Sequence, residues 1–285
     1  MLKTLPSKRP FLSFILLGLW LVITNTINFL QPLQPFTSIA HRGASLYAPE
    51  NTMASFQKAL ELGFDYIELD VRLSKDQQLV VIHDDDVRRT TDGIGAIGDL
   101  TVKELKMLDA GSWFSPDFRD ERIPLLDEVL LQFGRKIGIL IDVKSPETQP
   151  GLVEILSNLL TYHIEGGLDP DSLKVQTFNF NELKKIKEHV PAIGTGLLLN
   201  KPLDMLKLAS YRPYASFLSI HHQLLSKEFI KKAQLLGFDI FSWTIKKQYQ
   251  FTMMQRIGVH GIISDEEYRK SEYRFTSFIS PIIKE

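Results

Sequence analysis

The chain has 285 residues and no cysteine. Disulfide bonds, thiolate nucleophiles and zinc–thiolate sites are therefore excluded, and a packed core must supply the stability. An excess of one charge is also missing, because 33 lysines and arginines oppose 34 aspartates and glutamates, for a formal net charge of −1. That balance excludes a broad basic surface for nucleic acid. No protein partner is predicted.

Ionisable side chains are absent between Arg9 and His41, and the run Phe11–Ile23 in this interval is almost continuously apolar. A run of about thirteen residues suits a signal peptide, whereas its extension through Leu30 approaches the roughly 20 residues that span a bilayer. No small-residue cleavage site follows Ile23, which favours a retained membrane anchor over cleavage and secretion. Because the basic residues precede the run, the rest of the chain is expected outside the cytoplasm.

From residue 36 onward, short β-branched runs alternate with stretches of helical period, as in the βαβ units of a parallel sheet. Eight βα units in about 240 residues predict an α/β fold, the (β/α)8 TIM barrel. The rival is an open doubly wound sheet, but no G-x-G-x-x-G turn follows a strand. The predicted strands are Thr37–His41, Asp65–Val71, Ile137–Val143, Leu173–Phe178, Ile193–Leu199, Phe217–His221, Phe238–Thr244 and His260–Ser264. The predicted helices are Asn51–Leu62, Gly151–Leu160, Asn181–Glu188, Pro202–Ala209, Ser226–Leu236, Lys247–Ile257 and Glu266–Ser271.

One apolar run departs from this repeat. Leu79–His83 follows the second strand after five residues, too few for a parallel crossover, so it must return antiparallel as an extra hairpin strand. A turn centred on Asp76 pairs Val71 with Val81 and returns His83 toward the second strand.

An insertion over residues 85–124 follows the hairpin, with a short helical stretch at Val102–Leu108. Insertions at the catalytic face of a barrel commonly shape the substrate pocket. The predicted domains are a signal-anchor segment with its linker at residues 1–35, the barrel at 36–275 and a C-terminal tail at 276–285.

Polar side chains gather where the predicted strands end, which is where TIM barrels carry their chemistry. Glu68 and Asp70 lie two residues apart on one strand, so their carboxylates share a face. Grouped carboxylates suit Mg²⁺ or Ca²⁺ better than zinc. Each residue alone also fits a structural role, and the argument for a site rests on their convergence. The further strand-end candidates are His41, Arg42, His83, Asp142, Lys144 and Trp243.

These candidates belong to an ordered series of sequence blocks. The blocks are His41-Arg42-Gly43, Ala48–Thr52, Ile67–Val71, Ser74–Asp76, Val81–Asp84, Arg89–Gly93, Leu108–Phe114, Arg122–Leu125, Trp243-Thr244 and Gly261–Asp265. In this order they resemble the glycerophosphodiester phosphodiesterase family, TIM-barrel enzymes of the phospholipase C-like phosphodiesterase superfamily. The resemblance extends from about residue 38 to residue 265.

The resemblance implies metal-dependent hydrolysis of a glycerophosphodiester to glycerol 3-phosphate and an alcohol. His41 and His83 would form the acid–base pair, since histidines can exchange these roles near neutral pH. A neighbouring substrate hydroxyl would attack phosphorus to give a cyclic phosphate that water opens, so no protein nucleophile is needed. Arg42 and Lys144 would hold the phosphate, Trp243 would offer the substrate a flat surface, and the Ca²⁺ or Mg²⁺ ion would lie on Glu68, Asp70 and Asp142.

Three positions depart from the family pattern. Asp142 stands where the family usually has glutamate, so the affinity or preference for the metal is expected to differ. Lys246 and Thr177 replace the usual asparagine and serine, and bear on substrate choice.

Asn51 is predicted to cap a helix and brace the site.

Two alternative functions remain open. The same site would act as a lysophospholipase D on membrane lysophospholipids if an apolar channel, lined by the insertion around Trp113 and Phe114, lies beside its mouth. The second alternative is an inactive barrel that binds phosphoesters or a partner.

Overall fold

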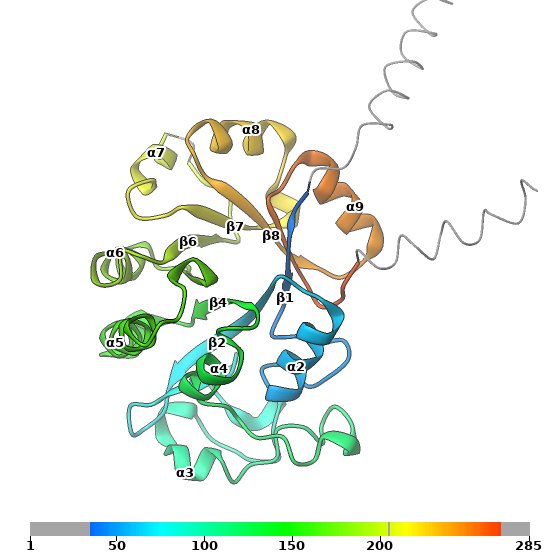
Figure 1. Ribbon diagram of the computed structural model, residues 1–285, viewed down its shortest axis with the longest axis vertical. Helices are drawn as coiled ribbons and strands as arrows, with labels where there is room; N and C mark the ends of the chain where they lie inside the picture. Colours follow the sequence, from blue (N-terminus) through cyan, green and yellow to red (C-terminus); the bar gives the residue numbers. More distant parts are fainter. Residues whose placement is uncertain (1–34, 205, 269–285) are drawn as a thin grey trace, which may run out of the picture. The chain divides into compact units, whose positions relative to one another are not determined.

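The computed structural model describes residues 35–204 and 206–268. Within them, eight parallel strands close into a barrel, because β1 pairs with both β2 and β9 (Figure 1). The predicted TIM barrel is confirmed, and each strand lies within two residues of its predicted bounds. In ring order the strands are β1 (Thr37–Ala40), β2 (Tyr66–Leu73), β4 (Gly138–Val143), β5 (Leu173–Thr177), β6 (Gly194–Leu199), β7 (Phe217–His221), β8 (Asp239–Ile245) and β9 (Gly261–Ser264).

Helices lie around the outside of the barrel (Figure 1). They are α2 (Met53–Leu62), α4 (Leu126–Phe133), α5 (Leu152–Glu165), α6 (Phe180–His189), α7 (Leu208–Tyr211), α8 (Lys227–Leu235) and α9 (Gln248–Ile257), with 3₁₀ turns η4 (Pro146–Thr148), η5 (Pro170–Ser172) and η6 (His222–Leu224) between elements.

The helical predictions differ from the structure in several places, one of which is the end of α5, five residues beyond the predicted Leu160. Helix α4 was not predicted. The predicted helix Pro202–Ala209 is a single turn, α7, because Asp204 accepts hydrogen bonds from the next residues and forms a turn there. Residues 266–268 are irregular where the helix Glu266–Ser271 was expected, and 269–271 lie outside the described residues.

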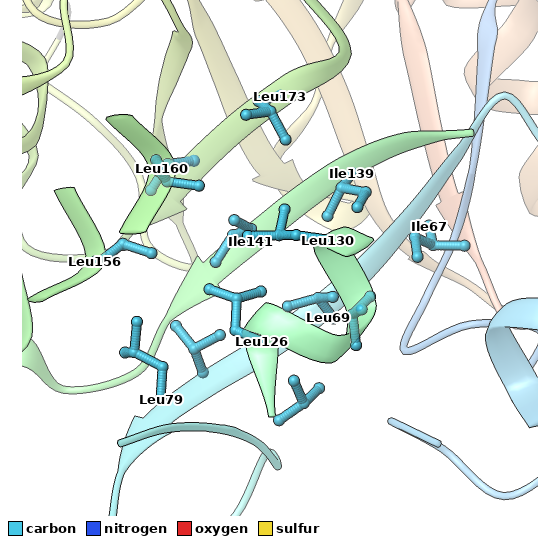
Figure 2. Packing of buried hydrophobic residues seen from close by; sticks show 14 of the residues in the cluster. Ile67, Leu69, Leu79, Leu126, Leu130, Ile139, Ile141, Leu156, Leu160 and Leu173 are labelled. Carbon is cyan, nitrogen blue, oxygen red and sulfur yellow. The ribbon is translucent and has the colours of Figure 1, made fainter. Parts of the chain in front are cut away.

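Side chains on the barrel strands alternate between the outer and the inner face. Ile67 and Leu69 of β2, and Ile139 and Ile141 of β4, are fully buried and pack beneath α4 and α5 (Figure 2). Each such burial contributes about 1.5–3 kcal/mol. Because side chains alternate along a strand, the polar residues between them face the barrel interior.

Apolar residues fill the lower interior of the barrel. Phe217 and Phe241 stack with ring centroids 4.7 Å apart. They pack with Ile39, Leu140 and Ile263 into a separate buried cluster. This buried cluster packs the barrel interior beneath the polar side chains at the strand ends.

The hairpin is confirmed, since β3 (Leu79–Val81) runs antiparallel to β2 with Val71 opposite Val81. The insertion that follows contains η1 (Val87–Arg89), η2 (Ile97–Asp99), α3 (Val102–Leu105) and η3 (Pro116–Phe118). It has a small core of its own, made by Val80, Ile82, Val87, Ile97, Leu105, Ala110 and Ile123.

Among residues 35–204 and 206–268, no helix combines the length and the apolar character that a membrane span requires. The predicted anchor over residues 11–30 and the tail over 276–285 lie outside the described residues.

Candidate active site

Three buried carboxylates form the centre of the site. Glu68 and Asp70 on β2 and Asp142 on β4 are at most 4% exposed. One oxygen of each lies within 4.8 Å of the others. Asp70 and Asp142 are direct neighbours in the register of β2 and β4, which explains their approach from positions 72 residues apart.

Two cationic side chains border the carboxylates. Lys144 places Nζ 2.8 Å from Asp70 Oδ1 and also forms an ion pair with Asp142. Arg42 donates its backbone N–H to Glu68 over 2.8 Å, and its Nε lies 3.4 Å from Asp70 Oδ2. The site therefore contains three buried carboxyl groups and two cationic side chains.

The turn after β1 positions Arg42. Arg42 and Gly43 have φ angles of 57° and 79°, in the left-handed region that glycine adopts freely. A Cβ at position 43 would lie 2.3 Å from Ser55 Oγ, so only glycine fits against the start of α2.

Asn51 braces the cluster, but not as the predicted helix cap. Thr52 is the N-cap of α2, and its side chain accepts a hydrogen bond from the Ser55 N–H. Asn51 instead donates Nδ2–H to Asp70 Oδ2 over 2.7 Å and accepts from the Asp70 N–H. It thereby fixes the rotamer of that carboxylate.

Each of the two histidines is paired with an aspartate. His41 Nδ1 lies 2.7 Å from Asp265 Oδ1, and His83 Nδ1 lies 2.7 Å from Asp84 Oδ1. Such a bond fixes the ring orientation and assigns the Nδ1 proton. The Nε2 atom of each ring is then the one available for proton transfer.

The three carboxyl groups differ in the direction of their pKa shifts. Burial raises the pKa of Glu68 well above its ordinary value, and the charges of Asp70 and Asp142 raise it further. Burial also raises the pKa of Asp142. It would raise that of Asp70 too, but Lys144 and Arg42 lower it instead. Two cations thus leave the three buried carboxylates incompletely neutralised.

The residues present fit a divalent cation. Asp142 Oδ1 is buried and accepts no hydrogen bond, and Asp70 Oδ1 is buried with the Lys144 ammonium beside it; hard cations prefer such carboxylate oxygens. Three carboxylates, two cationic side chains and one divalent ion sum to a charge of +1, which a phosphodiester anion would neutralise. Glu68, Asp70 and Asp142, the three residues named from the sequence, would hold the ion.

A cavity of about 260 Å³ opens over this cluster. Asp70 contacts both cationic side chains beneath it, so the structure brings all eight predicted site residues together. Phe178, Leu198 and Ile263 make an apolar side next to Trp243. The other predicted residues that line the cavity are His41, Arg42, Glu68, His83, Asp142 and Lys144.

The three remaining sequence expectations have different outcomes. Trp113 and Phe114 pack edge-to-face on each other and do not line the cavity, so they do not form the apolar channel that would favour a lysophospholipase D. Thr177 is buried, donates its hydroxyl to the Val143 carbonyl and does not line the cavity. Lys246 Nζ lies 3.8 Å from Oδ2 of Asp265, the partner of His41.

Sequence reasoning gave no role to several residues around the site. Asp265 satisfies the same strand-end criterion as the others, and Asp84 directly follows His83. Gln176 faces Asp142 across the β4–β5 register, lines the cavity and leaves Oε1 buried without a hydrogen bond. Its position near the end of β5 was the available signal.

Comparison with known proteins agrees with this geometry. The model of the glycerophosphoryl diester phosphodiesterase family matches residues 41–267. The protein YhdW of Bacillus subtilis (strain 168) is 42% identical over 232 residues, covering 80% of this chain and 93% of the relative. A glycerophosphodiester phosphodiesterase of Caldanaerobacter subterraneus subsp. tengcongensis is 39% identical over 236 residues, with the same two coverages.

The solved structures include a phosphodiesterase of Oleispira antarctica in complex with its product, sn-glycerol-3-phosphate. It matches with a TM-score of 0.75 at 29% identity, over 86% of this chain and 97% of that one. The family model spans this chain from His41, directly after β1, to the residues after β9, and each of the two relatives matches 80% of this chain. The chain therefore belongs to the glycerophosphoryl diester phosphodiesterase family of enzymes.

Proposed function

We propose that the protein hydrolyses glycerophosphodiesters to glycerol 3-phosphate and an alcohol in a reaction that depends on Mg²⁺ or Ca²⁺. The observation that carries the proposal is the pair of aspartate-oriented histidines beside one cavity with Arg42 and Lys144. An anionic diester needs cationic groups to bind it, and proton donors and acceptors on either side of phosphorus.

In this reaction Arg42 and Lys144 bind the phosphate oxygens. One histidine accepts the proton of the attacking hydroxyl, and the other protonates the oxygen of the leaving alcohol. Burial lowers the pKa of His83, which favours the neutral, proton-accepting ring. When bound, the divalent cation supplies positive charge that stabilises the transition state. With a substrate hydroxyl as nucleophile, His41 and His83 exchange roles when water opens the cyclic phosphate.

The cavity favours small substrates. Its volume of about 260 Å³ lies just below the roughly 300–1,000 Å³ typical of sites for drug-sized ligands. Phe178, Leu198 and Trp243 can cover the carbon atoms of a glycerol group while the charged side binds phosphate. This supports glycerophosphodiesters over lysophospholipids, and both histidines of an active enzyme are in place.

The test is release of glycerol 3-phosphate from glycerophosphocholine and glycerophosphoethanolamine by the full-length protein, with Mg²⁺, Ca²⁺ or EDTA. His41→Ala and His83→Ala should each abolish metal-dependent release, whereas His189→Ala, an exposed histidine on α6, should not. Release of choline from lysophosphatidylcholine alone would move the assignment to lysophospholipase D. Silence of the folded protein on both substrates would favour the inactive barrel.

We further propose that residues 11–30 anchor the enzyme in a membrane with the barrel outside the cytoplasm. The support is the apolar run behind Lys3, Lys8 and Arg9. Two measurements on cells that express the full chain test this. Fractionation shows where the protein is, and protease treatment of a separate sample of intact cells shows whether the barrel is outside the cytoplasm. Protein at full length in the membrane fraction supports the anchor, a shortened protein in the medium supports secretion, and protein in the cytosol contradicts both.

A further inference from the structure

Arg89 on η1 makes the densest set of hydrogen bonds around the site. Its Nη1 and Nη2 donate to Glu50 Oε2 and Oε1 over 2.8 and 2.7 Å. Its Nε and Nη2 donate to Asp84 Oδ2 and Oδ1 over 2.6 and 3.2 Å. One planar guanidinium thus holds two carboxylates that lie 34 positions apart in the chain.

Both carboxylates also bind a residue of the proposed reaction. Asp84 Oδ1 pairs with His83 Nδ1 at 2.7 Å. Glu50 Oε1 accepts from Arg42 Nη1 at 2.8 Å. A continuous chain of bonds therefore joins the acid–base histidine to the phosphate-binding arginine, with Arg89 at its centre.

We propose that Arg89 is a positioning residue that sets the relative placement of His83 and Arg42 through Asp84 and Glu50. The inference rests on the proposed function and adds to it a residue from the insertion. Val87, in the same turn, is fully buried in the core of the insertion. The folded insertion therefore delivers Arg89 to the catalytic face.

The electrostatics of the two carboxylates agree with this role. The hydrogen bond from Arg89 is the largest influence on Asp84 and, with that from His83, lowers its pKa to about 2. Burial would raise the pKa of Glu50, but Arg89 and Arg42 lower it. Both groups remain ionised acceptors throughout the neutral range, so the chain of bonds persists there.

Exposed ion pairs usually contribute little to stability, and the Arg89 side chain is 44% exposed. The expected effect is therefore on geometry and catalysis more than on folding. The two-sided fork also demands arginine, because a lysine ammonium cannot bind both carboxylates bidentately.

Arg88 is a matched control from the same turn. Its side chain is 70% exposed and pairs with Asp86, and neither residue lines the cavity. Arg88→Gln should change kcat/KM by no more than about twofold, as expected of a surface substitution.

Arg89→Gln should lower kcat/KM for release of glycerol 3-phosphate by about 10- to 100-fold, the usual effect of removing an orienting partner. Arg89→Lys should fail to restore it. Combined with Asp84→Asn, the loss in kcat should be less than additive, and combined with Glu50→Gln the rise in KM should be less than additive. The Kd for inorganic phosphate, measured by calorimetry, should rise in Arg89→Gln but not in Arg88→Gln.

Thermal unfolding of each variant shows whether it is folded. Folded Arg89→Gln with the activity and phosphate affinity of Arg88→Gln overturns the inference, as do fully additive double substitutions. If the wild type releases no glycerol 3-phosphate, the proposed function fails. Arg89 is then judged by phosphate affinity alone, and equal Kd values for the two glutamine variants overturn its role.

Discussion

His41 and His83 have similar partners but reach them in different ways. Asp84 is the next residue after His83, whereas Asp265 comes from the other end of the barrel domain. Both bonds measure 2.7 Å and leave Nε2 as the reactive atom. The same ring nitrogen is therefore paired in both histidines, while the exposed fractions of their side chains, 16% for His41 and 34% for His83, differ.

Substitution of Asp265 by asparagine should impair catalysis without unfolding the barrel. The amide can donate to His41 Nδ1 and so stabilise the wrong tautomer, and kcat should fall by roughly 10²- to 10⁴-fold. Steady-state kinetics of Asp265→Asn measure this. Asp239→Asn is the control, because Asp239 lies 3.7 Å from His260, a histidine outside the cavity. Equal kcat values for the two variants would contradict the role of Asp265.

The pH dependence of kcat/KM should reflect the lowered pKa of His83. Burial is the main cause, and Lys144 and Arg42 add to it against the opposing effects of Asp70 and Asp84. Because the base must be neutral, activity should persist below pH 6.5, the ordinary histidine pKa, and fall only at lower pH. Asp84→Asn removes a bond that raises the pKa, so its acidic limb should move further down. A wild-type limb above pH 6.5 would refute this assignment.

At the scale of elements, short apolar, β-branched runs identified every barrel strand. The same pattern in Leu79–Val81, with the short connection before it, identified the hairpin. Helix α4 shows why helices were harder to predict. Its buried residues Leu126, Val129, Leu130 and Phe133 have helical spacing, but they cover only eight residues directly after an irregular insertion.

Strand β6 offers a packing test of the barrel interior. A Cβ on Gly196 would lie 2.0 Å from the ring of Phe217, which stacks on Phe241. Gly196→Ala should therefore cost about 1–3 kcal/mol, seen as a lower thermal midpoint. On the same strand, a Cβ on Gly194 would be 3.4 Å from the flexible Lys174 side chain, so Gly194→Ala should be tolerated. An equal midpoint for both variants would disprove this packing argument.

At the scale of the whole molecule, closure of the barrel creates the site. The first strand, β1, pairs with the last strand, β9, on one side and with β2 on the other, which closes the ring. Residues from both ends of the barrel domain therefore line the cavity. The carboxylate cluster connects β2 and β4 near one end of the domain. A ligand bound there should therefore stabilise the entire barrel.

Divalent cations should raise the thermal midpoint of the protein. At 100 times its Kd, a bound ion adds about 2.7 kcal/mol, which corresponds to roughly 5–10 °C in a protein of this size. Differential scanning calorimetry with Mg²⁺, with Ca²⁺ and with EDTA measures the shift. Asp142→Asn should reduce it, because the variant lacks one carboxylate. Identical midpoints with EDTA and with both cations would argue against a metal on Glu68, Asp70 and Asp142.

The amino-acid sequence by itself determined the alternation along each strand, and with it the shared face of Glu68 and Asp70 and the outer apolar layer. These features depend only on neighbouring residues, because side chains on a strand repeat every two positions. The tertiary structure alone decided which distant groups meet. His41 and Asp265 are 224 positions apart and approach to 2.7 Å because the first and last strands pair. Arg89 reaches Asp84 and Glu50 because the insertion packs against Val80 and Ile82 at the hairpin, a placement that depends on long-range packing rather than on local pattern.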